Sequence, residues 1–462
     1  MSPLNTPDSR IDRDLRALGW LALAIALAYA NALAGTFQFD DYNVIVYRDG
    51  VHSWQAWQDG LGHGIRPLLK ASYTLDWTLG WGVLGFHLSN LLIHLGMSWL
   101  VLLLSRHFIA QHARLRDLAS LPLLVALLFA LHPAHTEAVS YISGRSASLM
   151  GLFYLGGLLA YVHGRSPAQR FHLHLLTPLC FALALLSKET AVTFPFALLL
   201  WDICSGDGWR DGFARQWSSW LLLLVAALFF LFSSSYNSQM LHSANFNDLG
   251  GNFSTQLAGA LWMFKQWAMP LWLNIDPDLP VHRKVLDAPL ALLTVALLLA
   301  ASWRFRSSRP WITLALAWAL LQWLPLYLLL PRIDVANERQ LYLAGWPLCM
   351  AVVIEITLLL KPAQVRYAIT ALLLVCALLT IQRNHNYRSE IALWEDTVLK
   401  SPNKARVHNN LGHAYLLAGR RDEARAQFTA ASRLDPDYSR AHDNLRRLDA
   451  EMHKAGASPR PE

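Results

Sequence analysis

The chain has 462 residues, of which 54% are hydrophobic and only 15% are charged, and its formal net charge is +7. Soluble domains carry nearer a quarter charged residues, so this composition excludes an ordinary water-soluble globular protein. Basic residues in such an apolar chain are first of all signals of membrane topology, and the positive charge therefore predicts no nucleic-acid partner.

Apolar segments of roughly the length of a membrane span recur along the first four-fifths of the chain. They cover residues 15–35, 83–105, 118–131, 149–163, 173–187, 191–204, 218–235, 289–305, 311–330, 341–360 and 367–382. We interpret the first as a membrane helix, because it is long for the core of a signal peptide and no small-residue cleavage site stands out. The predicted fold is all-α, with a polytopic bundle of about eleven transmembrane helices over residues 1–383.

The basic residues predict the orientation of this bundle. If the N-terminus is cytoplasmic, short basic loops fall on the inner side, as the positive-inside rule requires. These loops are residues 106–116, 165–170, 210–215, 304–309 and 361–366. Residues 257–275 are apolar but interrupted by Lys265 and Pro270. If they crossed the membrane, the basic loop 304–309 would lie on the outer side. We therefore interpret them as an interfacial or re-entrant helix, which leaves the C-terminus external.

From about residue 384 the chain becomes polar and repeats itself at a spacing of 34 residues. Pro402 and Pro436 show this spacing, as do His408 and His442. It is the period of tetratricopeptide repeats. We predict a short repeat domain over residues 384–453 and a disordered tail over 454–462. Stacked repeats present a concave surface, so we expect a binding role, with a simple cap on the membrane domain as the alternative.

Unusual charges fall on the predicted outer side, and the first group follows the first span. Asp40 and Asp41 are adjacent, and Arg66 and Lys70 come later in the same loop. Paired carboxylates on a loop suit a general base, with or without a bound cation, beside fixed cations that would meet an anionic leaving group. The alternative is a solvated pair of loop carboxylates.

The second group, after the third span, contains His132, His135, Glu137 and Arg145. Imidazole and carboxylate ligands suit zinc or manganese, but no further ligand is visible. We favour a polar wall around a headgroup, with Arg145 bound to phosphate.

The third and fourth groups lie in two later connections. Lys188 and Glu189 occupy a very short turn between two spans, where a snorkelling ion pair is the alternative interpretation. The fourth group contains Arg332, Asp334, Glu338 and Arg339. Its two arginines can hold a phosphate bidentately.

The second span carries a polar stripe, because His87, Asn90 and His94 lie on one helical face. We expect these side chains to form interhelical hydrogen bonds. A proton path is the alternative.

Several of these strings together resemble a known family. They are FDDYNVI, RPLLKASYTLDWTLG followed by FHLSNLLIH, LHPAHTEAVSYISGRSASLM, LLSKET and NERQLYLAG. In this order, and followed by repeats, they resemble the transmembrane and tetratricopeptide-repeat O-mannosyltransferases, of the C-type glycosyltransferase superfamily. The short loops are typical of a bacterial member.

The resemblance implies a membrane glycosyltransferase that moves a hexose such as mannose from a polyprenyl-phosphate donor to a Ser or Thr hydroxyl of a protein. It implies that Asp40 and Asp41 are catalytic, one of them as the base, with inversion at the sugar. The candidates for the donor phosphate are Arg66, Arg145, Lys188, Arg332 and Arg339. The candidates for a supporting polar wall are His132, His135, Glu137, Glu189 and Glu338. A divalent cation, at the aspartates or at His132, His135 and Glu137, stays open.

The expected location is the inner membrane, with the site and the repeats on the periplasmic face, where the repeats would dock the acceptor. Three alternatives remain. A transporter would suit the intramembrane charges, but we find no inverted repeat. A non-enzymatic scaffold would use the repeats alone. A lipid or polysaccharide acceptor would keep the enzyme class and change the substrate.

Overall fold

The computed structural model describes residues 7–62, 64–232, 249–324, 328 and 334–457. Helices make up the regular structure of these residues, and they contain no strand. The predicted all-α fold is confirmed for the part of the chain that is described.

A described helix overlaps each of the eleven apolar segments. These helices are α1 (Pro7–Tyr29), α4 (Gly82–Ala110), α5 (Leu121–Leu131), α7 (Arg145–Gly164), α8 (Thr177–Ser187), α9 (Phe194–Cys204), α11 (Trp217–Phe232), α14 (Pro289–Phe305), α15 (Pro310–Trp323), α17 (Leu341–Leu359) and α18 (Pro362–Asn386). They pack around one large apolar core that includes the buried rings of Trp201, Trp318 and Trp346.

Five of the described helical segments are long and apolar enough to cross a membrane. They are Ile11–Ala34, Gly82–Ala110, Ile142–Gly164, Glu338–Leu359 and Pro362–Asn386. Two bent helix pairs raise the number to as many as seven, and two further apolar helices are shorter than a full span. The several apolar helices agree with a membrane protein, and the count of about eleven spans stays a prediction.

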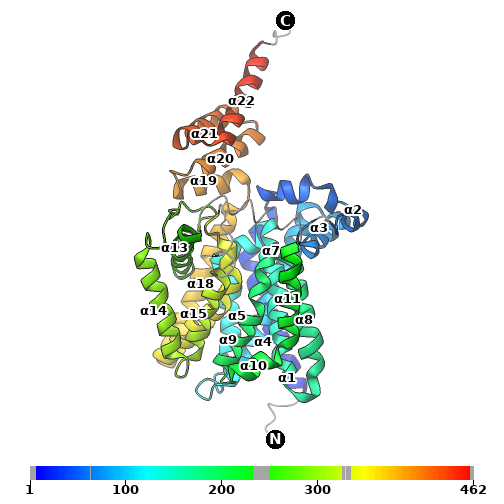
Figure 1. The fold of residues 1–462 in the computed structure, drawn as a ribbon, viewed down its shortest axis with the longest axis vertical. Coiled ribbons are helices and arrows are strands. Elements are labelled where there is room, and N and C mark those ends of the chain that lie inside the picture. Colours follow the sequence, from blue (N-terminus) through cyan, green and yellow to red (C-terminus); the bar gives the residue numbers. More distant parts are fainter. Residues whose placement is uncertain (1–6, 63, 233–248, 325–327, 329–333, 458–462) are drawn as a thin grey trace.

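Figure 1 shows that the N-terminal end of α1 and the C-terminal helices lie at opposite ends of the bundle. The short helices α2 (Trp54–Asp59) and α3 (Pro67–Leu79) lie at the end of the C-terminal helices, whereas α10 (Trp209–Arg215) lies at the end of the N-terminus.

The polar stripe of the second span makes three of the expected interhelical contacts. His94 Nδ1 is 2.8 Å from the Tyr342 hydroxyl of α17, and its Nε2 is 3.0 Å from the carbonyl of Ala130 in α5. The Asn90 amide donates to the carbonyl of Val139, in the short helix α6 (Thr136–Val139), at 3.0 Å. These bonds join α4 to three neighbours, which supports a packing role for the stripe.

The segment expected to be re-entrant begins in helix α13 (Leu249–Ala268). Leu257, Ala260 and Met263 are buried, and α13 packs against α14. The helix therefore lies against the bundle with much of its surface covered. The chain then continues without regular helix through residues 269–288 toward the C-terminal helices.

The C-terminal helices are α19 (Glu390–Lys400), α20 (Ala405–Leu417), α21 (Arg421–Leu434) and α22 (Ser439–Ala457). The predicted domain boundary at residue 384 falls in the last turn of α18, which ends at Asn386. Helix α22 extends to Ala457, and residues 458–462 of the expected tail lie outside the described part of the chain.

The period of 34 residues reappears in the contacts of these helices. His408 Nε2 is 2.9 Å from the carbonyl of Pro402, and His442 Nε2 is 2.8 Å from the carbonyl of Pro436. The same local arrangement thus occurs twice at the spacing read from the sequence. This recurrence supports the predicted repeats.

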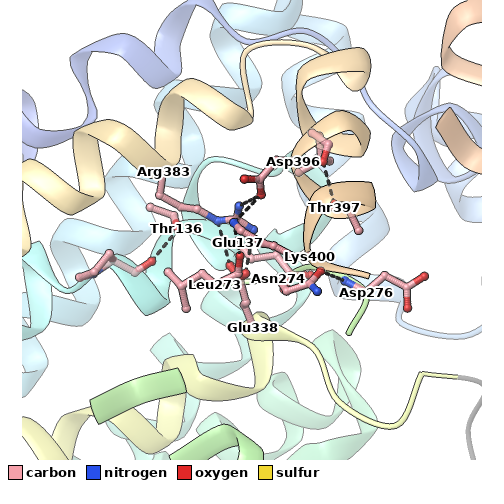
Figure 2. A network of polar contacts seen from close by, with 12 residues as sticks. Thr136, Glu137, Leu273, Asn274, Asp276, Glu338, Arg383, Asp396, Thr397 and Lys400 are labelled. Carbon is pink, nitrogen blue, oxygen red and sulfur yellow. Dashed lines mark hydrogen bonds and ion pairs between the residues drawn. The ribbon is translucent and has the colours of Figure 1, made fainter. Parts of the chain in front are cut away.

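Buried ion pairs join the C-terminal helices to the bundle. Figure 2 shows Arg383, from the end of α18, between Glu338 and Asp396. Its guanidinium is 2.7 Å from a carboxylate oxygen of each. Lys400 continues the chain of contacts, because its Nζ is 2.7 Å from Asp396 and 2.7 Å from the carbonyl of Leu273. These contacts therefore fix α19, the first of the C-terminal helices, to the bundle.

Candidate active site

Four connections at one end of the bundle converge, and they are the four charged groups noted in the sequence. Asp41 accepts a hydrogen bond from Ser143 in the connection before α7. Asp40 lies 4.0 Å from Arg339, in the connection before α17. Arg66, before α3, pairs with Glu189, before α9. Residues far apart in sequence thus form one polar site.

Asp41 is completely buried and its carboxylate is held by the protein. One oxygen accepts from the Ser143 amide at 2.8 Å and from the Ser143 hydroxyl, and the other accepts from the Gln38 amide at 3.0 Å. Burial raises the pKa of Asp41 to about 7, although these hydrogen bonds oppose the shift. Asp41 therefore joins its loop to the connection before α7, and it does not line either cavity beside Asp40.

Asp40, in contrast, presents its carboxylate to open space, with 38% of the side chain exposed. Its backbone amide donates to the Tyr141 hydroxyl at 2.9 Å. Phe39, just before it, has a φ of +46°, a conformation that non-glycine residues rarely adopt. Burial raises the pKa of Asp40 and Arg339 lowers it, with a net upward direction.

A cavity of about 300 Å³ opens on one side of Asp40. Its lining includes the cations Arg48, Arg66, Lys70 and Arg339, with Asp40 as the acidic residue. Arg66 is held by Glu189 through two hydrogen bonds of 2.9 and 2.6 Å. Neither Arg48 nor Lys70 forms an ion pair with a carboxylate of the described residues. Burial lowers the pKa of Lys70, with further contributions from Arg48 and Arg66.

The lining of this cavity carries an excess of positive charge. Arg48 and Lys70 form no ion pair there within the described residues, and cationic side chains make their strongest hydrogen bonds to anionic groups. Apolar side chains, among them Val44, Ile65 and Leu69, line the same cavity. The cavity thus combines cations with apolar surface.

Arg145, which the sequence predicts at a phosphate, lies instead inside the protein. Its side chain has no exposed surface and pairs with Asp76 at 2.6 Å. It also donates to Asn90 at 2.6 Å and to the Phe86 carbonyl at 2.9 Å. With these bonds its guanidinium is engaged within the protein, so Arg145 supports the packing of α3, α4 and α7. The structure does not bring it to the cavity.

Arg339 does reach the cavity and connects several of the expected groups. Its Nε is 3.5 Å from Glu137, and its backbone amide donates to the same carboxylate at 2.7 Å. Its neighbour Glu338 is buried and points instead to Arg383 (Figure 2). Glu137 therefore orients Arg339, whereas Glu338 belongs to the contact with the C-terminal helices.

The two histidines of the expected polar wall are buried in the protein. His132 stacks on Trp267 with ring centroids 5.0 Å apart, and His135 Nδ1 is 2.8 Å from the Phe129 carbonyl. Neither lines the cavities beside Asp40. No group of three or more His, Cys, Asp or Glu residues that could hold a metal occurs within the described ranges. The divalent cation stays a prediction.

Lys188 and Arg332 are the two remaining residues predicted to hold the donor phosphate. Lys188 is largely buried and lines a small cavity of about 20 Å³ together with Arg339. Arg332 lies outside the described residues.

Three residues beside the cavities or Asp41 were not predicted from the sequence: Arg48, Tyr141 and Ser143. Arg48 follows the acidic pair in the same loop, and that position was the one available signal. Tyr141 and Ser143 lie within the conspicuous HPAHTEAVSYISGR string but carry no charge. Their roles depend on a contact across about a hundred residues, at Asp40 and Asp41 respectively.

Sequence comparison identifies relatives along nearly the whole chain. It is 25% identical over 448 residues to a protein O-mannosyl-transferase of Caenorhabditis elegans, which covers 89% of this chain and 62% of that protein. It is 24% identical over 504 residues to protein O-mannosyl-transferase TMTC3 of Mus musculus, which covers 96% of this chain and 54% of that protein. The protein O-mannosyl-transferase Tmtc1 of Drosophila melanogaster is 36% identical over 209 residues, which cover 42% of this chain and 23% of that protein.

The chain is thus similar to TMTC-type protein O-mannosyl-transferases along nearly its whole length, in agreement with the resemblance read from the motifs. The chain spans 62% and 54% of the length of the first two relatives. No family model and no solved structure matches it.

Proposed function

We propose that this chain is a membrane mannosyltransferase that moves a hexose, mannose, from a polyprenyl-phosphate donor to a Ser or Thr hydroxyl of a polypeptide. The observation that carries the proposal is the position of Asp40. It is a partly exposed carboxylate between a cation-lined cavity of about 300 Å³ and a second cavity of about 210 Å³. A base between a phosphate-binding and an acceptor-binding space is what glycosyl transfer requires. The printed names of the relatives agree with this chemistry.

The proposed reaction is a single displacement. Asp40 removes the proton from the acceptor hydroxyl, whose oxygen bonds to the anomeric carbon of the sugar. The bond from that carbon to the phosphate oxygen breaks on the opposite face, so the configuration inverts. Polyprenyl phosphate leaves with both bonding electrons and one additional negative charge.

Arg48 and Lys70 stabilise this developing charge, with Arg339 between the phosphate and Asp40. Fixed cations aimed at the leaving group lower the barrier because they need not reorganise during the reaction. Arg66 is the weaker phosphate ligand, because Glu189 already accepts two of its hydrogen bonds.

We also propose that the site faces the periplasm from the inner membrane of a bacterium. Two observations support this orientation. The site lies at the end of the bundle with α2, α3 and the C-terminal helices, opposite the N-terminal end of α1 (Figure 1). The predicted inner loops are basic, and basic loops stay in the cytoplasm.

The test is transfer by purified protein. We would incubate it with short-chain polyprenyl-phosphate mannose and a Ser/Thr peptide, and measure a hexose mass on the peptide, the released polyprenyl phosphate and the anomeric configuration. Inverted mannosyl peptide with an equal amount of lipid phosphate is the expected result. A product with retained configuration would exclude the single displacement. A preparation that is folded but converts no donor, with peptide, lipid or polysaccharide acceptors, would favour the scaffold alternative.

A further inference from the structure

The second cavity beside Asp40 lies between the bundle and the C-terminal helices, and it has a volume of about 210 Å³. Its lining comes from both parts of the chain: Phe39, Asp40, Glu137, Tyr141, Ile275, Asp276, Asp334, Asn337 and Arg339 from the bundle, and Trp394 and Arg406 from α19 and α20. Asp40 and Arg339 also line the cation-rich cavity, so the two spaces meet at the candidate base.

The charge of this repeat-side cavity differs from that of the phosphate-binding cavity. Its lining has four carboxyl groups and two guanidiniums, against one carboxyl and four cations in the other cavity. The positive charge of Arg406 is already compensated, because Arg406 bonds to Asp276 at 2.8 Å and to Asp334 at 2.6 Å. Lys404 is a third cation near this cavity, and its Nζ is 2.6 Å from the Asp276 carboxylate. Such a lining disfavours a phosphate and accepts a neutral or basic group.

An aromatic wall faces these charges. Phe39 packs edge-on against Trp394 of α19, with ring centroids 5.0 Å apart, and Tyr141 and Ile275 belong to the same apolar cluster. Because Phe39 directly precedes Asp40, the C-terminal helices contact the residue next to the candidate base. The cluster also contains Leu411 and Phe428, so the core of the repeats continues into the site.

The position of the lining residues favours access to this cavity from the aqueous side rather than from the lipid. Most of its lining lies in connections between helices and in the C-terminal helices. The phosphate-binding cavity, in contrast, is lined by α3, whose Leu75 and Leu79 are exposed apolar residues of the kind that face lipid. An acceptor from the aqueous side is a better match for the repeat-side cavity than one embedded in the bilayer.

We propose that the repeat-side cavity is the acceptor subsite, and that it takes a polypeptide segment with neutral or basic residues beside the Ser or Thr. This inference rests on the proposed function, because it assigns the acceptor of that same reaction. The aromatic wall contacts the segment, the excess of carboxyl groups in the lining, Asp334 among them, favours basic over acidic side chains, and the hydroxyl lies at Asp40. The C-terminal helices are then part of the subsite itself, in addition to any docking surface farther along the repeats.

The experiment compares two peptides that differ only beside the Ser, with Lys in one and Glu in the other. Wild-type protein should show a several-fold lower KM for the Lys peptide. Asp334→Asn should reduce this preference several-fold through the peptide KM, with the donor KM unchanged. The matched control is Asp449→Asn, because Asp449 forms a similarly exposed pair with Arg425 at 2.8 Å outside the cavity. It should keep the wild-type preference.

A second readout does not depend on catalysis. A peptide with a photoreactive residue beside the Ser should cross-link to residues 334–339 or to α19 and α20. Transfer with cross-links elsewhere, or with a preference insensitive to Asp334→Asn, would overturn the subsite and leave the proposed function standing. Transfer to a lipid or polysaccharide alone would overturn the polypeptide assignment. If the folded protein converts no donor at all, the proposed function fails, and this inference fails with it.

Discussion

The two adjacent aspartates provide the sharpest prediction, because their environments differ although their chemistry is the same. We predict that Asp40→Asn removes the base and lowers kcat about 10²–10⁴-fold, as expected for loss of general base catalysis. This loss corresponds to about 3–5 kcal/mol of barrier. The shape of the side chain is preserved and it is partly exposed, so the folded protein should remain as stable as the wild type.

Asp41→Asn should have the opposite profile. Its two oxygens accept from the Ser143 and Gln38 amides at 2.8 and 3.0 Å, and an amide can accept on one side only. The variant therefore leaves one buried donor without an acceptor, at about 1–3 kcal/mol. Loss of the charge itself should matter little, because the pKa of Asp41 is already raised to about 7. We expect a lower melting temperature and a kcat within about tenfold of the wild type, taking one decade as about 1.4 kcal/mol.

The assay is single-turnover transfer from polyprenyl-phosphate mannose at equal amounts of folded protein, with thermal unfolding measured on the same preparations. The reasoning is refuted if Asp41→Asn loses as much transfer as Asp40→Asn at equal folded content. It is equally refuted if Asp40→Asn retains wild-type transfer.

Three further predictions concern the donor, the pH dependence and the contact with the C-terminal helices. Lys70→Met should raise the donor KM by about tenfold or more, since a hydrogen bond to a charged group contributes about 1.5–3 kcal/mol, and an unchanged donor KM in a titration would remove Lys70 from the phosphate site. The rate should fall on acidification through a pKa above the ordinary 3.8 of aspartate, because burial raises the pKa of Asp40 and only its ionised form is a base. Rates measured from pH 4 to 8 would contradict this if they showed no acidic limb. Arg383→Met should destabilise the protein by about 3–5 kcal/mol, because it leaves the buried Glu338 unpaired. Arg425→Met, which breaks an exposed pair, should cost about 0–1 kcal/mol in the same thermal unfolding experiment and serves as its control.

The sequence by itself determined the elements and the residue types of the site. Apolar runs predict helices because each must bury its backbone polar groups within itself in a membrane, and a helix overlaps every predicted run. Charges that cannot face lipid must cluster in connections, so the groups around Asp40, Glu137, Glu189 and Arg339 could be found from composition alone. The spacing of 34 residues likewise predicted contacts that recur at that spacing.

The tertiary structure alone decided which of these residues line a cavity and which are buried in the protein. Asp40 and Asp41 are equivalent in sequence, and the contact with Ser143, about a hundred residues away, buries one and leaves the other open. Arg145 stands in a conspicuous motif but has no exposed surface, whereas Arg48, without such a motif, lines the cavity. Burial and partners arise from contacts between segments distant in the chain, and local patterns do not encode them. For the same reason, the joining of the C-terminal helices to the site through Phe39 and Trp394 became visible only in the folded protein.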